Sequence, residues 1–266
     1  MKPFLLFQKV FSKPYLRKLF EDKIARSSAV GRDGVRKGRF EDALDKEISI
    51  INRKVILGTY RFTGYKQRLI SKGPDKNPRQ ISIPTFRDRL TLRALCEVLA
   101  DVFSDAKIPP PHDYIKKIKE NLLDVDDGFC FLRVDIKNYY PTIDQKILIR
   151  RVRTKIRKTE LVRLIQNAIS TPTGKKNIAE NISKRGVPQG LSISNILSSV
   201  YLTKLDEKYK RDARYFRYVD DILIICRKRD AQSTFRSLKA DLKKLKLECH
   251  DLKEDGSVSC SPEIGQ

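Results

Sequence analysis

Residues 215–226 read YFRYVDDILIIC and carry the strongest indication of the fold. Two stretches rich in aromatic and β-branched residues, 215–219 and 222–226, flank the acidic pair Asp220-Asp221. Because such residues favour β-strands, the segment predicts a tight antiparallel hairpin with both carboxylates at its tip. A charged group beside buried strands costs free energy unless it is paired or binds a metal ion. The acidic pair therefore marks a candidate functional site.

A third carboxylate ends another apolar stretch. Residues 129–136 (FCFLRVDI) form a continuous β-type run, typical of a central strand, and Asp135 lies near its end. Three carboxylates on adjacent strand ends repel one another, and a divalent cation removes that repulsion. Mg²⁺ prefers oxygen ligands, and two such ions can clamp an in-line phosphoryl displacement. A lone Asp at a strand end is usually a turn or cap residue, but the three carboxylates together favour a metal site.

The rest of the chain predicts helices around these strands. The segment up to about residue 56 is expected to be mostly helical, and a hairpin follows, with strands near 60–70 and 80–83 joined by a turn at 72–78. Thr85 and Asp88 form a capping box that begins a strong helix. Apolar spacing predicts further helices near 114–123, 144–170, 193–205 and 235–245. This order of elements indicates an α+β fold with an antiparallel sheet covered by helices.

The charge of the chain restricts the class of partner. Its 266 residues carry a formal net charge of +23. Such an excess usually accompanies a polyanionic partner, most often nucleic acid, although a very soluble surface is the plain alternative. Two basic regions, 1–40 and 145–185, flank a less basic middle and suggest two walls of a groove. The basic helix predicted at 146–163 is expected to follow a nucleic-acid backbone with salt-dependent binding.

Several other classes of protein are disfavoured. No apolar run reaches the roughly 18 residues of a membrane span, and the first residues lack the features of a signal peptide. The five cysteines include no C-x-x-C pair, a pattern typical of a reducing intracellular compartment. With only two histidines, catalysis is expected to depend on carboxylates and on metal ions bound by oxygen. We therefore expect a cytoplasmic protein without a membrane partner.

Four motifs follow one another along the chain. They are RQISIP with TFRDRL at 79–90, VDIKNYYPTI at 134–143, GVPQG with Leu191-Ser192 at 186–192, and YVDD at 218–221. These resemble, in the same order, the fingers block, the first palm motif, the G-x-P-Q-G motif and the Y-x-D-D signature of reverse transcriptases. The resemblance covers about residues 30–260. It is closer to the bacterial lineage of group II intron, retron and phage-defence enzymes than to the retroviral one.

The resemblance implies the fingers and palm of a right-hand polymerase. An N-terminal extension and the fingers would occupy 1–122, with a basic helical contribution from 145–185. The palm, with its motifs A to D, would occupy 123–266. In the family a thumb follows the palm, whereas this chain ends about 45 residues after Asp221. The thumb is therefore expected to be absent or truncated, either because the chain is a fragment or because another protein or a bound RNA replaces it.

The resemblance also implies roles for single residues. Asp135, Asp220 and Asp221 would be the catalytic carboxylates, with Asp135 and Asp220 as the principal metal ligands and Asp221 as a weaker one. The backbone carbonyl of Ile136 would help to hold the metal ion on the nucleotide side. The implied cofactor is a pair of Mg²⁺ ions, for which Mn²⁺ can substitute.

Two further residues would shape the nucleotide pocket. Tyr140 matches the family's aromatic residue beneath the sugar, where its ring leaves no room for a 2′-hydroxyl; an ordinary core tyrosine is the plain alternative. Gln189 would line the pocket, although the turn that contains it could simply begin a helix.

Basic residues would contact the triphosphate. Arg79 and Lys72 would reach it from the fingers hairpin, with Arg68 and Lys76 as alternatives to Lys72. Lys253 falls near the family's motif-D lysine, which could protonate the leaving pyrophosphate. A solvated surface lysine is the alternative at that position.

The implied function is an RNA-directed DNA polymerase that extends a primer with dNTPs by two-metal phosphoryl transfer. Its partners would be an RNA template, the nascent DNA and, in a bacterial antiphage-defence role, a dedicated non-coding RNA. An RNA-templated RNA polymerase is disfavoured by the G-x-P-Q-G turn and by Tyr140. A catalytically weak RNA-binding scaffold is disfavoured by the three carboxylates, which are costly to keep without a metal ion. A fragment of an intron-mobility enzyme is the remaining alternative.

Overall fold

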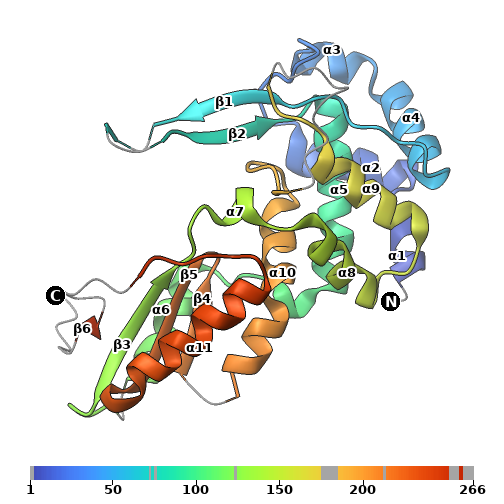
Figure 1. The fold of residues 1–266 in the computed structure, drawn as a ribbon. Helices are drawn as coiled ribbons and strands as arrows, with labels where there is room; N and C mark the ends of the chain where they lie inside the picture. Colours follow the sequence, from blue (N-terminus) through green and yellow to red (C-terminus); the bar gives the residue numbers. More distant parts are fainter. Residues whose placement is uncertain are drawn as a thin grey trace.

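The computed structural model describes residues 3–71, 73–74, 77–122, 125–174, 185–211 and 214–251, together with the backbone of 258–259. Its elements form two parts joined by long helices (Figure 1). One part holds a two-stranded antiparallel sheet of β1 (Lys66–Ile70) and β2 (Arg79–Ile83). The other holds a four-stranded sheet in the order β4–β5–β3–β6. Its strands are β3 (Phe129–Asp135), β4 (Arg214–Tyr218), β5 (Asp221–Arg227) and β6 (Val258–Ser259).

The segment before the first hairpin is helical, as the sequence predicts. Its elements are α1 (Pro3–Val10), α2 (Lys13–Leu19), a π-helical turn (Phe20–Ile24), α3 (Lys37–Asp42) and α4 (Leu44–Ile56). The later helices are α5 (Phe86–Val102), α6 (Pro111–Glu120), α7 (Tyr139–Thr142), α8 (Gln145–Lys155), α9 (Thr159–Ser170), α10 (Ser194–Tyr209) and α11 (Ala231–Lys244). Short 3₁₀ turns lie at Ser104–Ala106 and Lys228–Asp230. Within the described ranges, no helix combines the length and the apolar character needed to cross a membrane.

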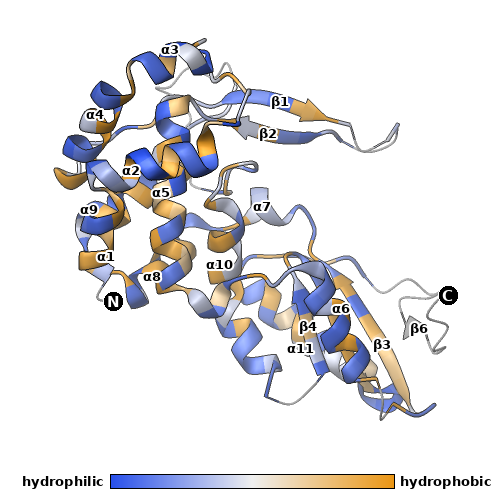
Figure 2. Cartoon of the chain, turned by 180° about the vertical axis from the view of Figure 1, so that it is seen from behind, coloured by the Kyte–Doolittle hydropathy of each residue, from blue (hydrophilic) through white to orange (hydrophobic). Residues whose placement is uncertain are grey.

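Strands β3 and β5 form the centre of the larger sheet. They pair antiparallel from Phe129 opposite Arg227 to Asp135 opposite Asp221. Helix α10 contacts β4 and α11 contacts β3, and Figure 1 shows α11 lying across the sheet. Figure 2 shows β3 as a largely hydrophobic strand. Side chains at alternate positions of the two central strands are almost completely buried: Leu132, Val134, Ile222 and Ile224.

Helix α5 connects the two parts of the molecule. It contacts α1, α2 and α4 as well as α10. The side chain of Thr85 accepts a hydrogen bond from the Asp88 amide (3.2 Å), so the predicted N-cap is confirmed. The Asp88 carboxylate accepts hydrogen bonds from the Tyr60 hydroxyl (2.8 Å), the Thr63 amide (3.0 Å) and the Thr85 hydroxyl (2.9 Å). This buried carboxylate therefore ties the start of α5 to the segment that leads into β1.

Two helical segments differ from the sequence-based expectation. The basic segment 144–170 forms α8 and α9 rather than one helix, because Ile156 is extended (φ −116°, ψ 108°) and completely buried. The helix expected at 114–123 begins earlier, at Pro111, since proline fits the first helical position, where its missing N–H is not needed. The turn expected at 72–78 includes residues 72, 75 and 76, which lie outside the described residues.

Asp88→Ala is expected to lower the free energy of unfolding by about 1–3 kcal/mol, because it leaves buried donors without an acceptor. Urea denaturation followed by circular dichroism measures the change. Asp101→Ala removes an exposed carboxylate from the same helix and is the matched control, with an expected effect below about 0.5 kcal/mol. Equal losses of stability in the two variants would contradict a structural role for the Asp88 hydrogen bonds.

Candidate active site

The three predicted carboxylates meet at one end of the larger sheet. Asp135 is the last residue of β3 and Asp221 the first of β5, and the two stand directly opposite each other. Asp220 lies in the turn between β4 and β5, where its carbonyl accepts a hydrogen bond from the Ile136 amide (3.4 Å). The side chains of Asp135 and Asp221 are about half exposed, 54 % and 52 %. The antiparallel register thus presents three carboxylates together at an accessible edge.

The charges of these carboxylates influence one another. Burial raises the pKa of Asp220, and the charges of Asp221 and Asp135 raise it further, while its backbone hydrogen bond and Arg79 act in the opposite direction. On the outer side, Arg133 lies 3.6 Å from Asp221 (Nη2 to Oδ1). Asp220 therefore lies next to two further carboxylates, with Arg79 and Arg133 as nearby cations.

The type of donor atom at this edge fits a hard divalent cation. Three carboxylates supply oxygen ligands only, and Mg²⁺ prefers such ligands while keeping positions for water and phosphate oxygens. Among the described residues, no group of three or more His, Cys, Asp or Glu side chains is arranged so that it could hold a metal ion, and this includes Asp135, Asp220 and Asp221. An open, incomplete set of carboxylates is suited to an ion that also binds a substrate phosphate.

The two adjacent tyrosines after β3 point in different directions. Tyr139 is 2 % exposed, and its hydroxyl donates to the Ser198 carbonyl (2.5 Å), so it belongs to the core. Tyr140 is only partly buried, and its hydroxyl donates to Oδ1 of Asn195 in α10 (2.8 Å). Burial raises the pKa of Tyr140, and the charge of Asp220 adds to that increase. Tyr140 is therefore the tyrosine that lies in the neighbourhood of the carboxylates.

The turn at 186–190 joins the site to the fingers hairpin. The Gln189 carbonyl accepts a hydrogen bond from the Ser82 amide in β2 (2.7 Å), and the Val187 amide donates to the Tyr140 carbonyl (2.9 Å). Gly190 has a φ of +94°, and a Cβ there would lie 2.7 Å from Cγ2 of Ile81. The turn thus bonds to β2 through Gln189 and to α7 through Val187. Its conformation requires glycine at position 190.

The predicted basic residues are only partly placed. Arg79 begins β2 and acts electrostatically on both Asp220 and Tyr140. Arg68 lies in β1, opposite Ile81, with an exposed side chain. The predictions for Lys72, Lys76 and Lys253 fall outside the described residues. The roles of all these residues at a nucleotide stay predictions.

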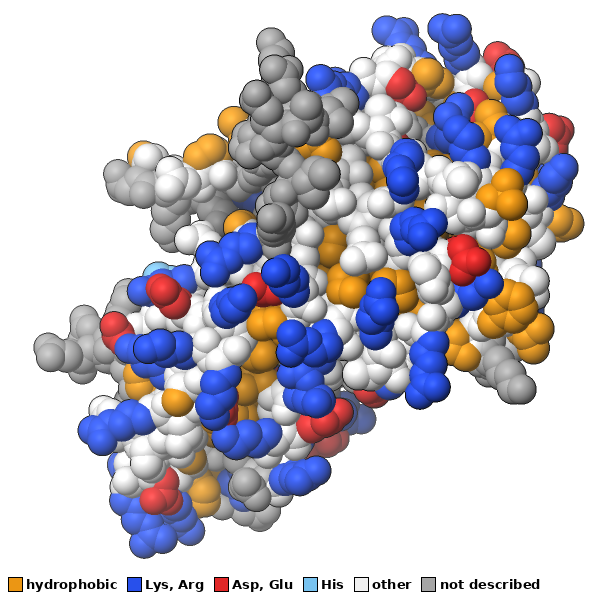
Figure 3. Space-filling model, turned by 45° about the vertical axis from the view of Figure 1, so that its right-hand side comes forward, with side chains coloured by type: hydrophobic (Ala, Val, Ile, Leu, Met, Phe, Trp, Pro, Cys, Tyr) orange, Lys and Arg blue, Asp and Glu red, His pale blue; other side chains and the backbone are white. Residues whose placement is uncertain are grey.

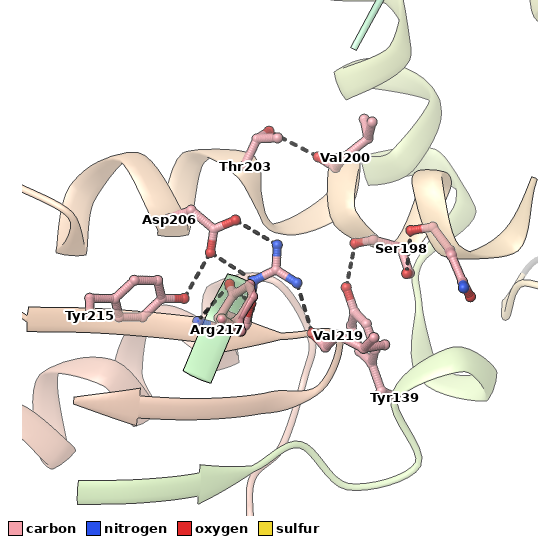
Figure 4. Close-up of polar contacts among 10 residues, drawn as sticks. Tyr139, Ser198, Val200, Thr203, Asp206, Tyr215, Arg217 and Val219 are labelled. Carbon is pink, nitrogen blue, oxygen red and sulfur yellow. Dashed lines mark hydrogen bonds and ion pairs between the residues drawn. The ribbon is translucent and has the colours of Figure 1, made fainter. Parts of the chain in front are cut away.

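Sequence reasoning missed two side chains beside the carboxylates. The His250 amide donates to the Asp135 carbonyl (3.0 Å), and its ring nitrogen Nε2 lies 3.8 Å from Oδ2 of Asp135. Arg217 donates a hydrogen bond to the carbonyl of Val219, the residue before Asp220, as Figure 4 shows. Strand alternation could have indicated Arg217, because it shares a face of β4 with the buried Tyr215. Local sequence carried no comparable signal for His250, which approaches Asp135 only through tertiary pairing.

An antiparallel sheet backed by helices, with three carboxylates where its central strands meet, defines a polymerase-type palm. The profile of the reverse transcriptase (RNA-dependent DNA polymerase) family matches residues 70–257. The match covers well over half of the chain, and the protein belongs to this family. The resemblance found in the sequence motifs is therefore confirmed.

Two curated relatives show the same relationship. Protein YkfC of Escherichia coli (strain K12) is 27% identical over 188 residues, which cover 66% of this chain and 49% of YkfC. Group II intron-encoded protein LtrA of Lactococcus lactis subsp. cremoris is 26% identical over 184 residues, 64% of this chain and 30% of LtrA. The chain thus spans half or less of the length of these relatives. Both matches agree with the predicted bacterial lineage.

Solved structures share the fold at low sequence identity. Apo telomerase from Candida tropicalis, truncated from its C-terminal domain, has a TM-score of 0.52 and 15% identity over 73% of this chain and 51% of its own. Telomerase from Candida albicans, in complex with a fragment of telomeric RNA, has a TM-score of 0.54 and 13% identity. This match covers 83% of this chain and 47% of the telomerase chain. The predicted α+β architecture with fingers and palm is confirmed by this likeness in fold.

Gly190→Ala is expected to lower the melting temperature by several degrees. Alanine at this positive φ is expected to cost about 1–3 kcal/mol of strain. In a chain of this size, each kcal/mol lowers the melting temperature by about 2–4 °C. Differential scanning calorimetry measures the shift. Gly38→Ala is the control, because Gly38 lies in α3 with open space around it and without a positive φ. An unchanged melting temperature in Gly190→Ala would mean that the turn does not need glycine.

Proposed function

We propose that this protein is an RNA-directed DNA polymerase that extends a primer with dNTPs by two-metal phosphoryl transfer. The observation that carries the proposal is the register of β3 and β5, which sets Asp135 opposite Asp221 with Asp220 in the adjoining turn. Membership of the reverse transcriptase family supports the assignment. Arg79 and Tyr140 lie within electrostatic reach of Asp220, as a nucleotide site beside the carboxylates requires.

The residues of the chain have distinct tasks in this proposal. Asp135 and Asp220 hold the metal ions, with Asp221 as a weaker ligand and the Ile136 carbonyl on the nucleotide side. When bound by these residues, Mg²⁺ would supply charge stabilisation to the attacking and leaving oxygens of the displacement. Arg79 binds the triphosphate through its forked donors, and Gln189 lines the pocket.

Tyr140 excludes ribonucleotides in this proposal. Its hydroxyl is held by Asn195 on α10, so the ring has little freedom to move away from an incoming sugar. Such a fixed ring beneath the sugar leaves no room for a 2′-hydroxyl. The hydrogen bond therefore supports a role for Tyr140 in selecting deoxynucleotides.

An RNA template and its DNA copy fit the charge of the protein. The chain carries a net charge of +23, and Figure 3 shows Lys and Arg side chains far more numerous than Asp and Glu on the face in view. Positive surface of this kind binds nucleic-acid backbones in a salt-dependent manner. The role in antiphage defence, the dedicated non-coding RNA, the replacement of a thumb, the use of Mn²⁺ and the cytoplasmic location stay predictions.

The double variant Asp220→Ala/Asp221→Ala is expected to reduce DNA synthesis by about 10³-fold, because several kcal/mol of metal-dependent stabilisation are lost. The purified full chain is incubated with Mg²⁺, labelled dNTPs, an RNA template and a DNA primer. Glu21→Ala/Asp22→Ala is the matched control: it removes an exposed adjacent acidic pair and changes the net charge equally. Equal synthesis by the wild type and the Asp220 and Asp221 double variant would refute the proposed site and favour the RNA-binding scaffold.

Tyr140→Gly is expected to increase incorporation of ribonucleotides relative to deoxynucleotides, because the space for a 2′-hydroxyl is opened. Competition between rNTPs and dNTPs in primer extension measures the ratio. Tyr140→Phe keeps the ring but loses the hydrogen bond to Asn195, so its discrimination should fall between that of the wild type and that of Tyr140→Gly. Unchanged sugar discrimination in Tyr140→Gly would rule out this residue as the selecting group.

A further inference from the structure

Arg217 is a buried cation that bridges a helix and the acidic turn. It is 8 % exposed, and its guanidinium forms a two-pronged ion pair with Asp206 of α10: Nε to Oδ1 at 2.7 Å and Nη2 to Oδ2 at 2.6 Å. The remaining arm, Nη1, donates to the Val219 carbonyl at 2.7 Å. Figure 4 shows these three bonds leaving one guanidinium group in two directions. The side chain therefore connects α10 to the residue that precedes Asp220.

Asp206 is itself held in place. Its Oδ1 also accepts a hydrogen bond from the Tyr215 hydroxyl (2.8 Å). Burial alone lowers the pKa of the Arg217 guanidinium, but the hydrogen bonds and charge of Asp206 more than offset this, so the net change is upward. On the outer edge of β4, the Tyr114 hydroxyl of α6 accepts from the Arg217 amide (3.2 Å) and donates to its carbonyl. Side chain and backbone of Arg217 are thus both anchored.

The turn that Arg217 contacts is strained. Tyr218 pairs with Asp221, so Val219 and Asp220 form a two-residue hairpin loop. Val219 has a φ of +57°, and Asp220 has no positive φ. Positive φ at the first loop residue is the geometry that usually takes glycine, and a β-branched residue there is a genuine outlier. Such a conformation persists only when its surroundings hold it in place.

We propose that Arg217, locked by Asp206, is a positioning residue that holds Val219 in its left-handed conformation and thereby aims the Asp220 carboxylate at the reaction centre. The inference rests on the proposed polymerase function, because it assigns a task within that reaction. The role requires a guanidinium group, which donates hydrogen bonds in two directions at once. Lysine has a single ammonium group and cannot reproduce the paired contact to Asp206 together with the bond to Val219. The ion pair thus sets the position of Val219 and the orientation of the Asp220 carboxylate.

Single-nucleotide incorporation on an RNA template tests this role. Arg217→Lys keeps the buried charge, and we expect it to lower kcat about 10- to 100-fold with little change in KM for the dNTP. The second variant, Arg217→Lys/Val219→Gly, is expected to recover most of the lost kcat, because glycine adopts positive φ without strain. A purely structural ion pair predicts no such rescue. Arg229→Lys, at an arginine with a side chain 84 % exposed, controls for the substitution itself.

Hydrogen exchange gives a readout that does not need activity. Amides of residues 219–221 are expected to exchange faster in Arg217→Lys than in the wild type, with Asp206→Asn as a second variant if Arg217→Lys folds poorly. A wild type without polymerase activity would refute the proposed function. The exchange rates would still decide whether Arg217 holds the turn at Val219. Equal exchange in the wild type and the variants would overturn the proposed role of Arg217. Equal kcat in the wild type and Arg217→Lys would also overturn it. So would a loss of kcat in Arg217→Lys that the added Val219→Gly does not relieve.

Discussion

The antiparallel ladder between β3 and β5 is the constraint on which the site depends. Its register sets Asp135 opposite Asp221, and a shift by one residue would turn one of these carboxylates toward the buried face. The apolar side chains beneath the ladder resist such a shift, because Leu132, Val134, Ile222 and Ile224 are almost completely buried. The hydrophobic pattern of two strands therefore fixes where the charges meet.

Polar groups in the interior give the fold its specific connections. A buried ion pair is weak evidence for stability, because the loss of hydration can exceed the attraction. Asp206 and Arg217 are better understood by what they connect, namely α10 and the turn before Asp220. The Asp88 carboxylate has a similar place between α5 and the segment leading into β1. In both cases a charged side chain sets the relative position of two elements that apolar packing alone would leave less sharply defined.

The turn at 186–190 couples the two parts of the molecule. Its backbone bonds to β2 through Ser82 and to α7 through Tyr140, so the fingers hairpin and the carboxylate edge share one loop. Arg79, at the start of the same strand β2, acts electrostatically on Asp220. Telomerase structures with 13–15% identity have a similar fold, which agrees with an architecture that depends on packing and register rather than on many particular side chains.

The sequence by itself determined the strands, the acidic turn and the family, because alternating or continuous apolar runs and short motifs are local signals. It also determined the α5 cap, since Thr85 and Asp88 lie within one helical turn. The tertiary structure decided which of Tyr139 and Tyr140 lies beside the carboxylates, that His250 approaches Asp135, and that Arg217 pairs with Asp206. It also separated α8 from α9 at the buried Ile156. These outcomes depend on partners distant in the chain, and the burial of one side chain by another cannot be derived from local spacing.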